Sequence, residues 1–128
     1  MEKQADEIEK FYESDNQLFL LEEINGKIVG NLTFRCGTRP RTVHAGEFGL
    51  TILQEYSGLG IGRRLMEFML GWARDTKRIY KINLRVRDGN NRAIQLYRKM
   101  GFIEEGRIKR GFLIGEKFHD AILMELCI

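Results

Sequence analysis

The chain has 128 residues, which is enough for one domain with a buried core and too few for two domains. Hydrophobic residues make up 43% of the chain and charged residues 30%, the balance of an ordinary globular protein. The formal net charge of +3 suits an anionic ligand such as a nucleotide without requiring nucleic acid, and no apolar stretch approaches the length that spans a membrane.

Cysteine use and the start of the chain predict a cytoplasmic protein. Cys36 and Cys127 lie far apart, form no C-x-x-C pair and are expected to stay reduced. Residues 1–13 are charged and lack the apolar run of a signal peptide.

The first part of the chain predicts a helix followed by a hairpin. Residues Glu2–Glu13 are highly charged, and their few hydrophobic side chains fall at helical spacing, which predicts a short amphipathic helix. Asn25-Gly26 then separates two apolar runs, and this dipeptide supplies the two positive φ angles of a tight turn. A β-hairpin is therefore predicted, with arms at residues 18–24 and 27–35.

The middle of the chain predicts a strand and a long helix with glycines between them. After a polar connection at residues 37–43, the pattern of residues 46–53 is typical of a strand. Apolar side chains at helical spacing then predict an amphipathic helix over residues 61–76.

Strand and helix patterns continue to alternate after this helix. Residues 80–87 alternate strictly between apolar and polar side chains, which predicts a strand. Asn90 is a candidate N-cap for a helix through Met100, and Gly101 ends that helix.

The C-terminal part predicts two more strands, at residues 102–109 and 117–126, around a connection at Gly111–Gly115. The predicted order is α, β, β, β, α, β, α, β, β, which is a mixed α/β layout and not a strict βαβ alternation. One domain over residues 1–128 is expected to hold all of these elements.

Three glycines alternate between the predicted strand and helix, at Gly58, Gly60 and Gly62. Glycine lets a ligand approach bare backbone N–H groups, and the N–H groups at a helix N-terminus carry partial positive charge without an intrahelical acceptor. Arg63 and Arg64 add full charges that would pair with phosphate oxygens. The loop predicts a pyrophosphate site, with an ordinary glycine-rich turn as the alternative. Its spacing fits neither the Walker nor the Rossmann pattern.

Two segments carry a resemblance to a known family. Residues 57–62 are similar to the acetyl-CoA pyrophosphate loop of the GNAT superfamily of N-acetyltransferases, Q/R-x-x-G-x-G/A, with Ser57 in place of Gln or Arg. Residues 90–102 resemble the N-x-x-A-I-x-L-Y-x-K-x-G-F segment of the same family, and the likeness to bacterial members runs from about Leu18 to the C-terminus.

The resemblance implies the α/β GNAT fold, a mixed, mostly antiparallel twisted sheet flanked by helices. Family domains usually open with a strand and two helices, whereas one helix is predicted before the hairpin here. The usual N-terminal strand and one helix are therefore expected to be missing, either because this member is naturally short or because the chain begins after a lost segment.

The resemblance also implies acetyl-CoA as the cosubstrate. No metal site is expected, because neither the two histidines nor the two cysteines form a ligand cluster. With Ser57 at the first motif position, the grip on the pyrophosphate is expected to rest on backbone N–H groups. Asn90 would contact the pantetheine arm, with N-capping as its alternative role. The implied cofactor-binding residues are Ile52, Leu53, Ser57, Gly58, Leu59, Gly60, Ile61, Gly62, Arg63, Asn90 and Tyr97.

Two residues are implied as catalytic. Tyr97 matches the family tyrosine whose hydroxyl lies near the cofactor sulfur, so it is the candidate acid, with core packing as its alternative. Glu47 corresponds to a glutamate that in some members acts as a base through water, with a surface carboxylate as the alternative. His44 is a second candidate base, and His119 and Asp120 fall near the acceptor end by resemblance.

The implied function is transfer of acetyl from acetyl-CoA to a primary amine by direct attack in a ternary complex. The acceptor is a small-molecule amine or a protein N-terminus, and no covalent acyl-enzyme is expected. A non-catalytic acyl-CoA-binding module is the alternative. Neither nucleic acid nor membrane is expected as a partner. A homodimer is compatible with the apolar end at residues 126–128, because many relatives dimerise.

Overall fold

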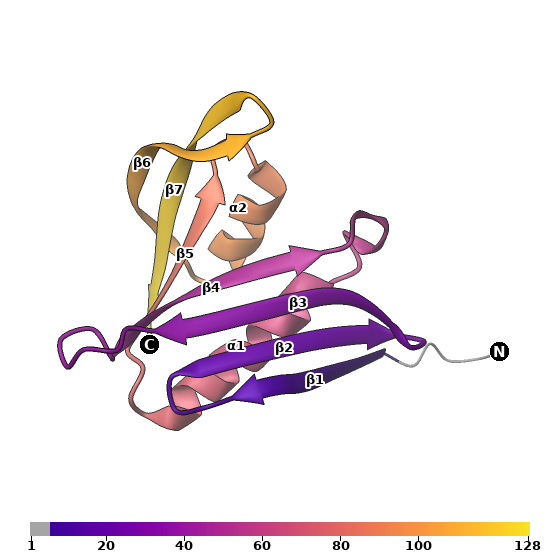
Figure 1. Cartoon of the computed structure of the whole chain (residues 1–128), viewed down its shortest axis with the longest axis vertical. Helices are drawn as coiled ribbons and strands as arrows, with labels where there is room; N and C mark the ends of the chain where they lie inside the picture. Colours follow the sequence, from indigo (N-terminus) through magenta and orange to yellow (C-terminus); the bar gives the residue numbers. More distant parts are fainter. Residues whose placement is uncertain (1–5) are drawn as a thin grey trace.

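The computed structural model describes residues 6–128, which form a seven-stranded sheet and two helices. The strand order is β1-β2-β3-β4-β5-β7-β6, and every neighbouring pair is antiparallel except β4 with β5. This mixed, mostly antiparallel sheet confirms the predicted fold class (Figure 1). The strands are β1 (Asp6–Glu13), β2 (Gln17–Ile24), β3 (Lys27–Cys36), β4 (Ala45–Ile52), β5 (Lys81–Arg87), β6 (Ile103–Ile114) and β7 (Lys117–Cys127); the helices are α1 (Ile61–Thr76) and α2 (Asn91–Lys99).

The hairpin predicted from Asn25-Gly26 is confirmed. The two residues adopt φ values of 51° and 81°, both in the left-handed region, and they join β2 directly to β3. These angles match the right-handed twist of the flanking strands, which is why Asn-Gly is favoured there. The turn fixes the register that places Leu20 opposite Leu32, both in the core.

The helix predicted over Glu2–Glu13 is wrong where the structure describes it. Asp6–Glu13 is strand β1, which pairs antiparallel with β2, and residues 2–5 lie outside the described part of the chain. The pairing register shifts between Lys10 and Tyr12. A bulge of this kind adds one residue and interrupts the period-2 pattern, so the hydrophobic spacing looked helical. Within residues 6–128 a strand, β1, precedes the hairpin in place of the predicted helix.

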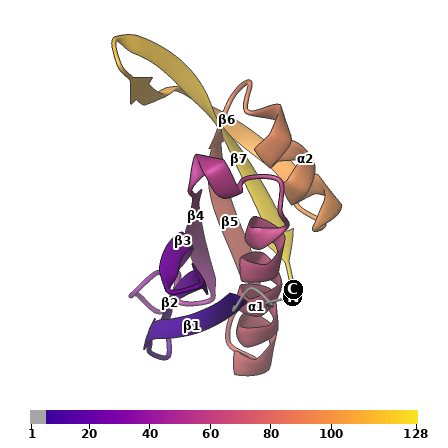
Figure 2. The same ribbon diagram turned by 90° about the vertical axis from the view of Figure 1, so that its right-hand side faces the viewer.

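The C-terminal connection predicted at Gly111–Gly115 is also wrong. Strand β6 continues to Ile114, and only Gly115 and Glu116 turn the chain into β7. A Cβ on Gly111 would lie 2.6 Å from the Cβ of Ala121, so this glycine serves a close approach between strands and not a turn. The long β6–β7 hairpin extends beyond the body of the molecule (Figure 2).

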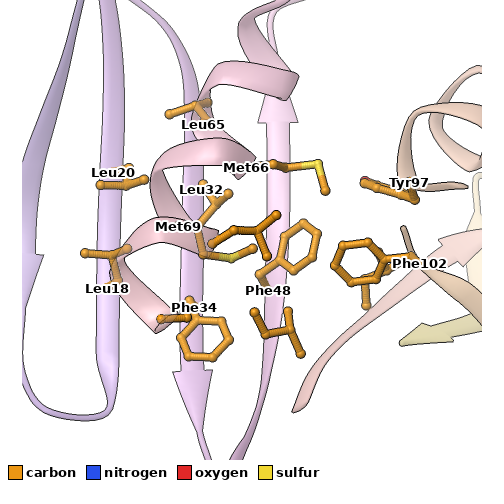
Figure 3. Packing of buried hydrophobic residues seen from close by; sticks show 14 of the residues in the cluster. Leu18, Leu20, Leu32, Phe34, Phe48, Leu65, Met66, Met69, Tyr97 and Phe102 are labelled. Atoms are coloured by element: carbon orange, nitrogen blue, oxygen red, sulfur yellow. The ribbon is translucent and has the colours of Figure 1, made fainter. Parts of the chain in front are cut away.

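The core lies between helix α1 and one face of β2, β3 and β4 (Figures 2 and 3). The predicted bounds of α1 are confirmed, and its buried face includes Leu65, Met66 and Met69. Burial alternates strictly along β2, so alternate side chains face the helix. This packing fixes where α1 begins, and the glycine loop is attached to that end.

We expect Leu32→Ala to lower the free energy of unfolding by about 2–5 kcal/mol, because Leu32 is fully buried under α1 and the truncation leaves a cavity. Chemical denaturation measures this loss. Leu113→Ala is the control: Leu113 is 61% exposed on β6, and its truncation should change stability by less than about 0.5 kcal/mol. Equal losses in the two variants would contradict this placement of the core.

Candidate functional site

The sheet opens between β4 and β5. Their parallel pairing covers three residue pairs, from Ala45–Lys81 to Glu47–Asn83, and then stops. Beyond that point β5 stays paired with β7, while β4 turns away with β3, and α2 lies beside the opening (Figure 1). The backbone of residues 48–52 therefore has no strand partner on its β5 side.

A cavity of about 540 Å³ lies on the open side of β4, between that strand and α2. Leu50 and Ile52 line it from β4, the glycine loop lines it at one end, and Asn90 to Lys99 contribute the wall from α2 and its cap. The cavity thus brings together the two segments that resembled the family motifs.

The glycine loop presents unpaired backbone donors to this cavity. Gly58 and Gly60 adopt φ values of 80° and 81°, which side chains rarely tolerate, and Gly60 is the N-cap of α1. Arg64 N–H makes the first bond of the helix, to the Gly60 carbonyl at 3.1 Å. The N–H groups from Gly60 to Arg63 therefore have no acceptor within the helix, and the helix dipole makes that end positive. Such a cradle fits a pyrophosphate.

The loop is held to the sheet by an ion pair whose carboxylate is buried. Glu22 on β2 is fully buried, and its Oε2 accepts a hydrogen bond of 2.7 Å from Arg64 Nη2. Arg64 Nη1 in turn donates to the Leu59 carbonyl at 3.4 Å. Arg64 therefore ties the loop to the sheet, a role that the sequence analysis did not foresee for it.

Two other arginines stand beside the loop. Arg63 forms an exposed ion pair with Glu67 at 3.0 Å, one helical turn further along α1. Arg92 was missed by the sequence analysis because it falls on a variable position of the family motif. Its guanidinium lies so near Gly58 that a Cβ there would meet Nη2 at 3.3 Å, and the residue lines the cavity. Arg92 thus places a positive charge on α2 beside the glycine loop.

Tyr97 and Asn90 both line the cavity from α2 and its cap. The Asn90 side chain accepts a hydrogen bond from Ala93 N–H at 3.4 Å, which confirms the predicted N-cap. Tyr97 is 8% exposed, and its ring packs on Phe48 and Phe102 (Figure 3). Burial raises the pKa of Tyr97 above its ordinary value, so the phenol keeps its proton at neutral pH.

Other predicted cofactor residues lie around the same loop with different surroundings. Ile52 lines the cavity, whereas Leu53 lies outside it and donates its N–H to the Val29 carbonyl at 2.8 Å. Ser57 also lines the cavity, and its hydroxyl donates to the Gln54 carbonyl at 2.6 Å. Leu59 is 58% exposed at the tip of the loop.

Glu47 and His44 lie at a second cavity, of about 1120 Å³. Its lining includes side chains of β2 to β5 that lie on the face of the sheet opposite α1. Glu47 is exposed and paired with Arg85, Nε to Oε1 at 3.1 Å. His119 and Asp120 line neither cavity, and Asp120 is bound to Arg107 at 3.1 Å. The two candidate catalytic residues, Tyr97 and Glu47, therefore line separate cavities.

Comparisons with known proteins agree with this arrangement. A sequence model of the acetyltransferase (GNAT) family matches residues 1–102. The chain is similar to the L-amino acid N-acetyltransferase AaaT of Escherichia coli (strain K12), with 34% identity over 101 residues, 79% of this chain and 62% of that protein. It is also similar to the spermidine N(1)-acetyltransferase of the same strain, with 35% identity over 78 residues, 61% of this chain and 42% of that protein.

A solved structure shares the fold. The crystal structure of an acetyltransferase of the GNAT family from Streptococcus pneumoniae gives a TM-score of 0.86 at 38% identity, over 90% of this chain and 69% of that chain. The chain thus spans less than two thirds of the length of either curated relative. No helix among residues 6–128 is long and apolar enough to cross a membrane.

The ion pair between Glu22 and Arg64 can be tested by mutation. Glu22→Gln removes the charge that holds Arg64, so the loop should lose its fixed shape, and the dissociation constant for coenzyme A should rise about tenfold. Isothermal titration calorimetry measures this change. Glu23→Gln changes the next carboxylate along β2 and should leave binding unaltered. Unchanged binding in a folded Glu22→Gln protein would show that the ion pair does not shape the loop.

Proposed function

The chain belongs to the acetyltransferase (GNAT) family, and from this membership and the geometry of the site we propose that it transfers an acetyl group from acetyl-CoA to a primary amine. The observation that carries the proposal is the convergence of an N–H cradle and a buried tyrosine on the cavity where β4 and β5 part. AaaT and the spermidine enzyme are named for two kinds of amine acceptor, an amino acid and a polyamine.

The donor site divides into two parts. The N–H groups of Gly60 to Arg63 would hold the pyrophosphate, with Arg63 and Arg92 supplying charge beside it. The backbone of residues 48–52, which has no strand partner on its β5 side, and the apolar wall of Leu50 and Ile52 would hold the pantetheine arm. Bound there, acetyl-CoA supplies a thioester whose carbon–sulfur bond breaks as the acceptor nitrogen forms an amide, which gives an N-acetyl product and free CoA thiol.

Tyr97 would act at the leaving sulfur. Because burial raises its pKa, Tyr97 stays a hydrogen-bond donor throughout the neutral range. A phenol is a weaker acid than a thiol, by about 1.5 pKa units for the free groups, so full proton transfer to a free thiolate is uphill. The tyrosine therefore stabilises the developing negative charge by a hydrogen bond, and the thiol takes its proton in the end from solvent.

Glu47 would act on the acceptor side. Its carboxylate lines the second cavity at the last residue pair before the strands part. An amine that enters from that side must lose a proton to become nucleophilic, and Glu47 would accept it through water. The amine then attacks directly, because the cysteines are poorly suited to carry the acetyl group. Burial raises the pKa of Cys36, and Cys127 lies outside both cavities.

We expect Tyr97→Phe to lower kcat about 100-fold with little change in the dissociation constant for acetyl-CoA, because the ring and its packing remain while the donor is lost. Release of free CoA thiol, followed across a panel of amines, measures kcat, and calorimetry measures binding. Tyr80→Phe, an exposed tyrosine before β5, is the control and should retain full activity. Acetyl-CoA binding with no thiol release for any amine would identify a non-catalytic acyl-CoA-binding module instead.

We expect no covalent acetyl-enzyme to form. Incubation with acetyl-CoA and no acceptor should leave the intact protein mass unchanged, because neither cysteine lines the donor cavity and a buried thiol is mostly protonated. Mass spectrometry of the intact protein provides the measurement. A gain of one acetyl group that disappears on addition of an amine would overturn direct attack.

A further inference from the structure

The second cavity contains a row of polar side chains on neighbouring strands. Arg35 on β3 is paired with Glu47 on β4, and Glu47 is paired with Asn83 on β5. Residues directly opposite each other in a sheet project to the same face, and all three line the cavity. Adjacent strands lie about 4.8 Å apart, so the row from Arg35 to Asn83 spans roughly 10 Å. A small molecule with two polar groups fits such a distance.

Asn83 has an unsatisfied atom in this row. Its Oδ1 is buried and finds no hydrogen-bond partner among the described residues. An unpaired buried acceptor costs free energy, so its presence at a cavity wall points to a ligand that donates a hydrogen bond. The neighbouring carboxylate of Glu47 is an acceptor as well. This end of the row suits the N–H groups of an amine.

The other charges of the cavity oppose a polycationic acceptor. Glu47 is the one carboxylate among the described lining residues, and Arg85 already pairs with it. Lys81 is held by Glu105 at 2.6 Å and Glu125 at 3.1 Å. Arg35 forms no ion pair within residues 6–128, so its guanidinium is available for an anion. A carboxylate is the natural partner, because the guanidinium fork matches its geometry.

Aromatic side chains border the cavity on the side of β1 and β2. Phe11, Tyr12 and Phe19 line it, and the rings of Phe11 and Phe19 lie 5.2 Å apart. Phe19 is paired across the sheet with Thr33, and Thr33 with Gly49. These two small residues leave a hollow between the aromatic side chains and the polar row. A large apolar side chain would fill that hollow and bury surface against the rings.

We propose that the acceptor is a free α-amino acid with a large apolar side chain, its amine bound by Asn83 and Glu47 and its carboxylate by Arg35. The proposal rests on the proposed function, since it names the amine that this acetyltransferase uses. Polyamines lack the carboxylate, and amides of the same amino acids lack its charge, so both should be poor acceptors.

Three acceptors, one variant and one control variant test the acceptor class. With acetyl-CoA and release of CoA thiol as the readout, kcat/KM for L-phenylalanine should exceed that for L-phenylalaninamide and for spermidine at least about tenfold, the value of one charge-assisted hydrogen bond. Arg35→Ala should lower the value for phenylalanine to that of the amide and leave the amide unchanged. Arg39→Ala, in the loop before β4 and outside the cavity lining, is the matched control and should change neither.

Asn83→Ala separates a binding role from a structural one. If Asn83 Oδ1 accepts a hydrogen bond from the acceptor amine, the substitution should raise KM for phenylalanine about tenfold. The melting temperature should not fall, because no internal hydrogen bond is lost. A lower melting temperature with unchanged KM would assign Asn83 to folding and overturn its place in the acceptor site.

The outcomes distinguish the two proposals. Equal rates with phenylalanine and its amide, or a preference for spermidine, would overturn the amino acid class while acetyl transfer itself stands. Acetyl-CoA binding without thiol release for the three acceptors and for a wider panel of amines would overturn acetyl transfer and the acceptor class together.

Discussion

Parallel pairing between β4 and β5 ends at Glu47 and Asn83, and the site depends on that ending. If the two strands had stayed paired, the backbone of residues 48–52 would be used up in the sheet and no cavity would separate them. Side-chain packing replaces the missing ladder: Phe48, the next residue, packs its ring on Tyr97 at 5.9 Å and on Phe102 at 5.8 Å. The opening therefore has backbone without a partner on its β4 side and packed aromatic rings beside it. Because these rings already bury their apolar surface, the two strands gain little by closing together.

The glycine loop is placed against this opening by the core. Helix α1 packs on β2, β3 and β4, which fixes the position of its N-terminus, and the buried carboxylate of Glu22 holds Arg64 in the first turn. A buried carboxylate lowers stability unless it is paired with a cation. Glu22 therefore holds the Arg64 guanidinium against the sheet. Arg92 approaches the loop from the other side, on α2. The loop thus lies between two halves of the molecule, each of which contributes a cation.

Local signals predicted much of this structure. Asn25-Gly26, the amphipathic pattern of α1 and the Asn90 cap each act over a few residues, and each was predicted with the right type of element. Errors arose where tertiary contacts decide: a bulge disguised β1 as a helix, and Gly111 resembled a turn although it serves close packing on Ala121. The pairing of Arg64 with Glu22 joins residues 42 positions apart, and no spacing rule reveals it. The row of Arg35, Glu47 and Asn83 is likewise set by strand register, which the sequence pattern does not reveal.

The central claim is that the donor is held by backbone N–H groups of the glycine loop and of residues 48–52, the part of β4 that has no partner on its β5 side. Hydrogen–deuterium exchange with and without coenzyme A tests it most directly, because it reports on individual N–H groups and not on activity. Slower exchange on binding is expected for residues 58–63 and 48–52, with little change in the β6–β7 hairpin. Protection confined to other segments, or none despite measured binding, would contradict the account.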